Sequence, residues 1–226
     1  MSTLLTHFGE SPVIRGGLFK MRTHPQSFQG LREAGLELVK ELKELHSFEF
    51  VTEVSTPEQI EMVAPAVSAF QVGTRSMYNY ELLRELNKYK KPVILKRAFS
   101  ATLDEWIGAS EYLSKIQDMV ILCERGIRGF DPKLRNVLDL GSVTYLKDQT
   151  DFKIIVDPSH ALGKREYVAK LCYAAMAAGA DGLLIEVHPD PMRALSDPDQ
   201  AIDLQTYAEL TKTLSKLAAI FNREVL

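Results

Sequence analysis

Three side chains in the last third of the chain are of types that bind divalent transition metals. They are the imidazole of His160 and the carboxylates of Glu186 and Asp197. Mn²⁺, Fe²⁺, Zn²⁺ and Co²⁺ all accept such nitrogen and oxygen ligands, so the set predicts a metal site. A structural reading stays open, because His160 ends a turn-forming Asp-Pro-Ser-His segment and Asp197 is a residue type that begins helices.

Basic residues form a second candidate group, and most of them follow a short apolar run. The group comprises Arg15, Lys20, Arg22, Arg75, Lys96 and Arg125. Gathered at one mouth of a fold, these cations would focus a positive field and suit a substrate that carries one or two phosphates. Asp157 also follows an apolar run, three residues before His160.

Lys96 is compatible with more than one chemistry. It ends an apolar run, which is where a barrel aldolase of the Schiff-base type could hold its reactive lysine. A charged lysine at the same place would instead bind a phosphate group or act as a general acid. The position alone does not decide between these roles.

Both cysteines are expected to be structural. Cys123 lies inside an apolar run next to Glu124, and Cys172 lies in a helical pattern. Their separation and apolar surroundings favour reduced core thiols over a disulfide framework, which predicts a cytoplasmic protein. We therefore propose no nucleophilic thiol.

The elements that must position these residues alternate along the chain. Apolar runs rich in Val and Ile predict seven strands, and segments of helical period between most of them predict helices, for example around Leu82 to Leu86. The strands are expected at 13–14, 48–54, 69–72, 92–95, 119–122, 153–156 and 182–187. A closing helix is expected from about Gln200 to Phe221, and Leu4, Leu5 and Phe8 are expected in the tail of a first helix.

Nearly continuous apolar strands that alternate with amphipathic helices indicate an α/β fold with a parallel sheet. No linker interrupts residues 1–226, so we expect a single barrel domain of the TIM (β/α)8 type that lacks the first βα unit. A doubly wound sheet is the alternative, but no GxGxxG motif follows the first strand, since the segment reads Arg15-Gly16-Gly17-Leu18-Phe19-Lys20.

Composition narrows the classes of partner. The chain has 27 Lys and Arg against 30 Asp and Glu, so its net charge of −3 gives no general attraction to nucleic acid or to an anionic membrane. The longest uncharged run, 62–74, is too short and too polar to span a bilayer, and the first residues do not resemble a signal peptide.

Several motifs resemble the compact type I branch of 3-deoxy-D-arabino-heptulosonate 7-phosphate (DAHP) synthase, which is related to 3-deoxy-D-manno-octulosonate 8-phosphate synthase. The similarity runs from about Val13 to the C-terminus. The motifs occupy 15–23, 95–97, 122–128, 156–161, 185–189 and 194–197.

The resemblance implies a (β/α)8 barrel that joins phosphoenolpyruvate to erythrose 4-phosphate, the first step of the shikimate pathway. It implies that Arg15, Lys20, Arg75, Lys96 and Arg125 hold phosphoenolpyruvate, and that Lys20, Arg22 and Thr23 meet the sugar phosphate. It further implies that Asp157 orients the aldehyde end, and that His160, Glu186 and Asp197 bind the metal.

Two departures from the family pattern keep other readings open. The family's first strand carries a Gly-Pro-Cys-Ser motif with a fourth, cysteine ligand, and this sequence starts after that point. The family's Lys-Pro-Arg-Thr-Ser loop reads Lys20-Met21-Arg22-Thr23-His24. The sequence is therefore compatible with a truncated reading, a metal-weak or metal-independent enzyme, a synthase for another aldose phosphate, or a barrel that only binds phosphorylated ligands. A missing strand would leave open edges, so we expect a homo-oligomer.

Overall fold

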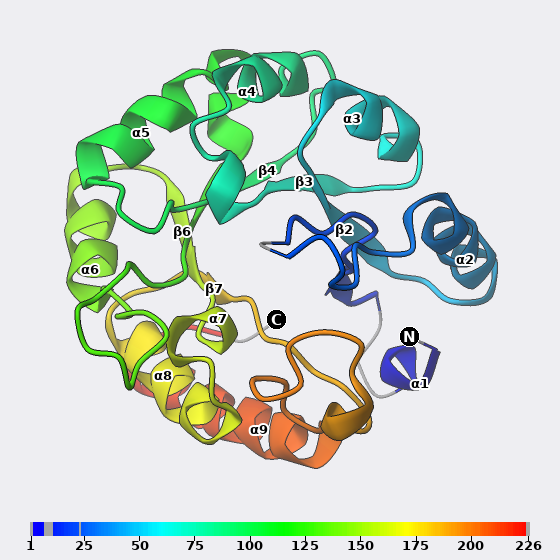
Figure 1. Cartoon of the computed structure of the whole chain (residues 1–226). Coiled ribbons are helices and arrows are strands. Elements are labelled where there is room, and N and C mark those ends of the chain that lie inside the picture. Colours follow the sequence, from blue (N-terminus) through cyan, green and yellow to red (C-terminus); the bar gives the residue numbers. More distant parts are fainter. Residues whose placement is uncertain (1, 7–10, 23, 225–226) are drawn as a thin grey trace. The chain divides into compact units, whose positions relative to one another are not determined.

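The computed structural model of the protein describes residues 2–6, 11–22 and 24–224. The chain divides into two compact units, 1–121 and 122–226. Within the described residues, short strands alternate with helices in both units (Figure 1). None of the described helices is long and apolar enough to cross a membrane.

The first unit contains four parallel strands that pair in the order of the sequence. Helices α2, α3 and α4 lie on one side of strands β2 to β4 (Figure 1). Its elements are α1 (Ser2–Leu5), β1 (Val13–Arg15), α2 (Arg32–Leu45), β2 (Glu49–Val54), α3 (Pro57–Val63), β3 (Ala69–Val72), η1 (Thr74–Ser76), α4 (Tyr80–Leu86), β4 (Val93–Lys96), α5 (Leu103–Glu111) and η2 (Ser114–Met119).

The second unit continues the same alternation from strand β5, whose residues cross the boundary between the units after Ile121. Strands β6 and β7 are parallel, with Ile155 opposite Gly182. The elements are β5 (Val120–Glu124), α6 (Leu140–Gln149), β6 (Lys153–Val156), α7 (Ser159–Leu162), α8 (Arg165–Ala177), β7 (Gly182–Leu183), η3 (Pro191–Arg193) and α9 (Leu204–Ile220).

Local capping fixes where several helices begin. Thr102 and Glu105 form a reciprocal capping box at the start of α5, in which each side chain bonds the other residue's backbone N–H. The side chain of Asp203 accepts a hydrogen bond from the N–H of Thr206 and begins α9. These caps satisfy backbone donors that the first helical turn leaves without partners.

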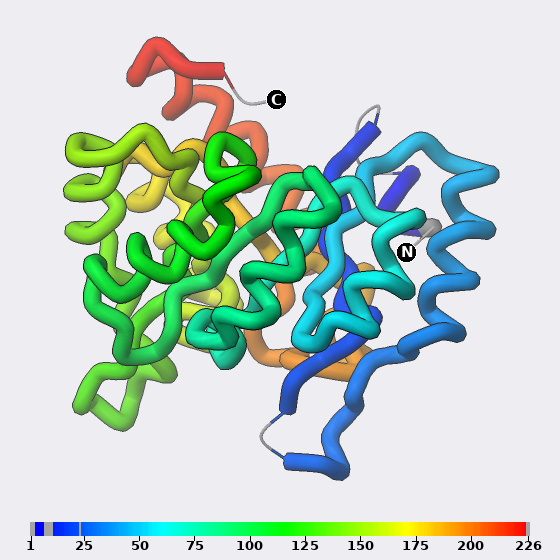
Figure 2. Tube along the Cα trace, turned by 90° about the horizontal axis from the view of Figure 1, so that it is seen from above, coloured from blue at the N-terminus to red at the C-terminus, as the bar shows by residue number. Residues whose placement is uncertain are grey.

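Each unit has apolar packing of its own. In the first unit, β3 and β4 are buried along their whole length, and the fully buried indole of Trp106 donates a hydrogen bond to the carbonyl of Leu95 over 3.2 Å. In the second unit, α8 and α9 lie side by side (Figures 1 and 2), and Cys172 packs in a cluster that includes Leu210 and Leu214. Continuous burial of β3 and β4 explains why their sequences are apolar runs.

The structure confirms the seven predicted strands and shortens the last. The predicted strand at 182–187 ends at Leu183, because the N–H of Leu184 still reaches Val156 but the N–H of Glu186 bonds the hydroxyl of Ser159 instead. The closing helix is α9, and the predicted first helix is α1. Phe8, which was expected in that first helix, lies outside the described residues.

Candidate functional site

The candidate residues lie at or after the carboxyl ends of strands in both units. In the first unit, Arg15 ends β1, Arg75 follows β3 and Lys96 ends β4. In the second unit, Arg125 follows β5 and Asp157 follows β6. Parallel strands end at the same edge of a sheet, so each unit presents its polar residues at one edge.

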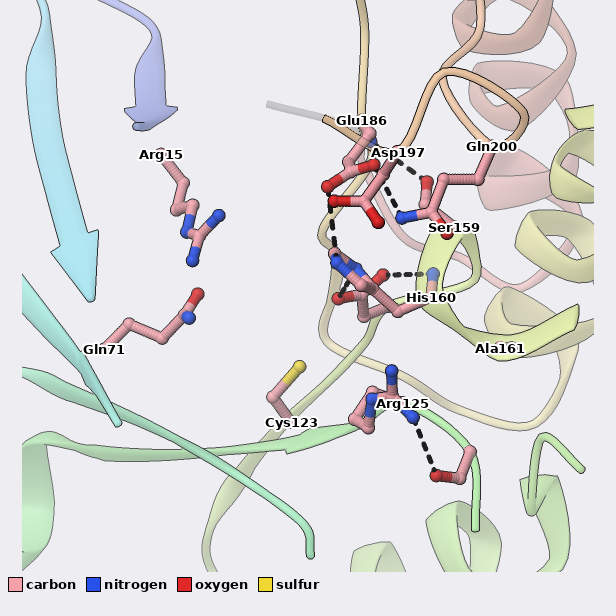
Figure 3. Close-up of polar contacts among 12 residues, drawn as sticks. Arg15, Gln71, Cys123, Arg125, Ser159, His160, Ala161, Glu186, Asp197 and Gln200 are labelled. Atoms are coloured by element: carbon pink, nitrogen blue, oxygen red, sulfur yellow. Dashed lines mark hydrogen bonds and ion pairs between the residues drawn. The ribbon is translucent and has the colours of Figure 1, made fainter. Parts of the chain in front are cut away.

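The predicted metal ligands come together in the second unit. His160, Glu186 and Asp197 each offer one ligand atom, and these atoms lie within 4.8 Å of one another (Figure 3). The imidazole Nε2 of His160 lies 3.3 Å from Oε1 of Glu186. Two atoms bound to one ion at roughly 2.2 Å each are separated by about 3 to 4.4 Å, so this pair fits a shared cation. One imidazole and two carboxylates suit Mn²⁺, Fe²⁺, Zn²⁺ or Co²⁺.

Asp157 fixes the orientation of His160. Its carboxylate is fully buried and contacts His160 twice, accepting from the backbone N–H over 3.0 Å and lying 2.8 Å from the ring Nδ1. A carboxylate can only accept a hydrogen bond, so it holds the ring proton on Nδ1 and leaves a lone pair on Nε2. Nε2 is the ring nitrogen that lies 3.3 Å from Oε1 of Glu186.

Local backbone structure places the two carboxylate ligands. The N–H of Glu186 donates to the buried hydroxyl of Ser159 over 3.0 Å, which ties the segment after β7 to helix α7. Asp197 has a left-handed backbone with φ of 53°. Among residues other than glycine, aspartate tolerates this conformation well, and a strained backbone is often found at functional sites.

A polar cluster in the first unit joins three strands. Oε2 of Glu53 accepts hydrogen bonds from NH2 of Arg15 over 2.7 Å and from Nε2 of Gln71 over 3.0 Å. Gly73 allows this approach, since a Cβ there would lie 2.2 Å from the Glu53 carboxylate. Nε of Arg15 and Oε1 of Gln71 are buried without a hydrogen-bond partner among the described residues (Figure 3). A polar ligand or water would satisfy both atoms.

Two further candidate cations are deeply buried. Lys96 and Arg125 are 4% and 3% exposed. Burial lowers the pKa of Arg125, and the attraction of the Asp157 carboxylate opposes that effect. Buried cations bind anions strongly because little water competes for them.

The remaining predicted residues are less enclosed. Arg75 is exposed, and its guanidinium lies 5.5 Å from the centre of the Phe99 ring. Lys20 and Arg22 are half-buried in the segment after β1, where the N–H of Lys20 donates to the carbonyl of Gln29. Thr23 lies outside the described residues.

Sequence reasoning missed Gln71, Gln200 and Arg135. Gln71 had a detectable signal, since it is a polar residue inside the apolar run 69–72. Gln200 bonds Glu186, and Arg135 bonds Gln200 from a loop 65 residues earlier. Nothing in their local sequence marks that contact.

Both cysteines are buried thiols, and no disulfide joins them. Burial raises the pKa of Cys172 to about 12. This agrees with the prediction that it is a structural thiol.

Comparisons with known proteins give matches to one enzyme family and its relatives. The model of the DAHP synthetase I family matches residues 4–223. A phospho-2-dehydro-3-deoxyheptonate aldolase of Thermotoga maritima is 42% identical over 207 residues, and a 2-dehydro-3-deoxyphosphooctonate aldolase of Cupriavidus taiwanensis is 28% identical over 222 residues. These alignments cover 91% and 89% of this chain, and 61% and 75% of the relatives.

The crystal structure of phospho-2-dehydro-3-deoxyheptonate aldolase (DAHP synthase) from Thermotoga maritima is similar over 100% of this chain, with a TM-score of 0.92 and 39% sequence identity. The likeness covers 66% of that chain and confirms the predicted α/β fold of the TIM-barrel type. The chain thus spans about three fifths of the length of its Thermotoga relative.

Proposed function

The chain belongs to the DAHP synthetase I family, and on that premise we propose that it condenses phosphoenolpyruvate with erythrose 4-phosphate. The products are DAHP and inorganic phosphate. The observation that carries the proposal is the convergence of His160, Glu186 and Asp197 after strands β6 and β7, with Asp157 holding the histidine ring.

The cations are assigned to the two anionic substrates. The carboxylate and phosphate of phosphoenolpyruvate are bound by five of them, namely Arg15, Lys20, Arg75, Lys96 and Arg125. Burial of Lys96 and Arg125 supports this assignment, as do the unsatisfied polar atoms of Arg15 and Gln71. The segment with Lys20, Arg22 and Thr23 meets the phosphate of the sugar.

A divalent cation, one of Mn²⁺, Fe²⁺, Zn²⁺ or Co²⁺, would be held by Nε2 of His160 and by the carboxylates of Glu186 and Asp197. When bound, it supplies Lewis acidity toward the aldehyde oxygen of the sugar. Asp157 acts on the aldehyde end indirectly, because both of its oxygens contact His160.

The chain's own residues account for the rest of the reaction. The cations hold C3 of phosphoenolpyruvate against the aldehyde carbon, and a carbon–carbon bond forms between them. The ammonium of Lys96 gives a proton to the aldehyde oxygen, which becomes a hydroxyl group. Water adds at C2, and inorganic phosphate then leaves from C2 with cleavage of the C2–O bond to give the ketone. Of the two protons of this water, one leaves with the phosphate and the other restores the Lys96 ammonium. Lys96 acts as a charged acid and forms no Schiff base in this scheme.

A second aldose phosphate is the nearest alternative substrate. It is favoured by the similarity to a 2-dehydro-3-deoxyphosphooctonate aldolase, whereas the higher identity to the Thermotoga heptonate enzyme favours erythrose 4-phosphate.

Consumption of phosphoenolpyruvate in the presence of Mn²⁺ decides between them. We expect turnover with erythrose 4-phosphate that exceeds turnover with arabinose 5-phosphate, with one phosphate released per phosphoenolpyruvate consumed. A preference for arabinose 5-phosphate would overturn the substrate assignment. Thermal stabilisation by phosphoenolpyruvate without turnover on either aldose would overturn the enzymatic function and favour a protein that only binds phosphorylated ligands.

A further inference from the structure

The predicted metal ligand Glu186 accepts a hydrogen bond from the side-chain amide of Gln200. Gln200 is 2% exposed, and its Nε2 donates to Oε2 of Glu186 over 2.7 Å (Figure 3). Its Oε1 accepts from NH1 of Arg135 over 2.6 Å. The amide orientation is therefore fixed from both sides, since Arg135 can only donate and the ionised Glu186 can only accept.

This arrangement decides which oxygen of Glu186 is available. Gln200 engages Oε2, while Oε1 is the oxygen that lies 3.3 Å from Nε2 of His160. A carboxylate with one oxygen held has lost most of its rotational freedom before a cation arrives. Less ordering then remains to oppose binding.

The interposed amide also solves an electrostatic problem. A guanidinium placed directly on Glu186 would neutralise the ligand charge and repel a cation. With Gln200 between them, Arg135 orients Glu186 through a neutral group. The orientation of Glu186 is transmitted while the guanidinium stays one side chain away from this carboxylate.

Arg135 is itself held beside the cluster. Its NH1 lies 4.0 Å from Oδ1 of Asp197, and its aliphatic part passes over Gly163, where a Cβ would lie 3.1 Å from the arginine Cδ. Gly163 ends helix α7, which carries His160. The next residue, Asn136, is 3% exposed and donates to the carbonyls of His160 and Ala161 over 3.0 and 3.2 Å.

We propose that Arg135 and Gln200 are positioning residues that set the affinity and coordination geometry of the metal site, and that the loop between β5 and α6 braces this site. The inference rests on the proposed metal site. Neither residue contacts the cation or a substrate in this scheme. Gln200 acts through the Glu186 carboxylate, and Arg135 acts through Gln200 and through its ion pair with Asp197.

The first test compares two glutamines in the same unit. Gln200→Leu removes the hydrogen bond to Glu186, and Gln205→Leu removes a similar one, in which Nε2 of Gln205 donates to Glu209 over 3.1 Å on the exposed face of α9. Dissociation constants for Mn²⁺ and Co²⁺ are measured by competition with a chromogenic chelator. The absorption spectrum of the Co²⁺ protein reports coordination geometry.

We expect Gln200→Leu to bind both ions about 10- to 100-fold more weakly and to change the Co²⁺ spectrum, with Gln205→Leu indistinguishable from the unmodified protein. A second pair of variants tests the outer residue. Arg135→Met should weaken binding, while Arg135→Lys, which keeps a donor for Gln200, should restore most of it. Arg135 is 40% exposed, so these variants should fold even if Gln200→Leu does not.

The outcomes separate the two proposals. Failure of the unmodified protein to bind Mn²⁺ or Co²⁺ overturns the metal site itself. Binding by the unmodified protein, together with unchanged affinity and an unchanged Co²⁺ spectrum in Arg135→Met and in any folded Gln200→Leu, overturns only the positioning role. Melting curves in chelator identify which variants are folded.

Discussion

Replacing Asp157 with asparagine is expected to disable His160 as a ligand while leaving its position nearly unchanged. The asparagine oxygen can still accept from the backbone N–H of His160, which lies 3.0 Å from Oδ1 of Asp157. The NH2 group of the asparagine then takes the place of Oδ2 of Asp157, which lies 2.8 Å from Nδ1 of His160. Nδ1 must accept that hydrogen bond, so the ring proton moves to Nε2 and occupies the lone pair that would bind the cation.

Turning the amide over does not relieve the conflict, because the NH2 group would then meet the backbone N–H of His160. A hydrogen bond with a charged partner contributes about 1.5 to 3 kcal/mol. At about 1.4 kcal/mol per tenfold change, losing the preference for the correct tautomer weakens metal binding roughly 10- to 100-fold.

Isothermal titration of Asp157→Asn with Mn²⁺ measures this loss. Asp203→Asn is the matched control, because Asp203 also accepts from a backbone N–H, over 2.7 Å, and asparagine caps helices equally well. The control should bind Mn²⁺ like the unmodified protein. If folded Asp157→Asn binds Mn²⁺ with unchanged affinity, the tautomer argument is wrong.

Three further predictions concern stability and reactivity. Trp106→Ala should lower the free energy of unfolding in urea by about 3 to 5 kcal/mol, since the indole is fully buried, and a loss below about 1 kcal/mol would contradict this. Asp203→Ala should cost about 1 kcal/mol at pH 7. Hydrogen bonds from Thr206 hold the pKa of Asp203 below that of an ordinary aspartate, so this difference from the unmodified protein should persist through mildly acidic pH and shrink as Asp203 protonates at lower pH. Because burial raises the pKa of Cys172 to about 12, peptide mapping should find it unmodified by iodoacetamide at pH 8 in the folded protein and modified in urea.

The strands were predictable because burial leaves a direct mark on composition. The apolar runs at 69–72 and 153–156 match β3 and β6 residue for residue. The last strand was predicted too long, since Leu184, Ile185 and Val187 are apolar like the residues of a strand, but the amide of Glu186 bonds Ser159. The periodicity of a sequence reflects where its apolar side chains lie, and it gives no information about the hydrogen-bond partner of each backbone amide.

The site was predictable where chemistry is carried by unusual side chains at strand ends. His160, Glu186 and Asp197 stood out by type, and the structure brings them together. Gln200 and Arg135 are ordinary polar residues whose role depends on a contact across 65 positions, which no local pattern encodes. The roles of individual substrate ligands, the single barrel domain and the homo-oligomer stay predictions.

Metal dependence of the condensation is the most direct test of the proposed chemistry. Phosphoenolpyruvate consumption with erythrose 4-phosphate is measured in excess chelator and again after Mn²⁺ is restored. The convergence of His160, Glu186 and Asp197 predicts no turnover in chelator and recovery with Mn²⁺. Equal turnover under both conditions would contradict a role for this cluster as the metal site of the reaction.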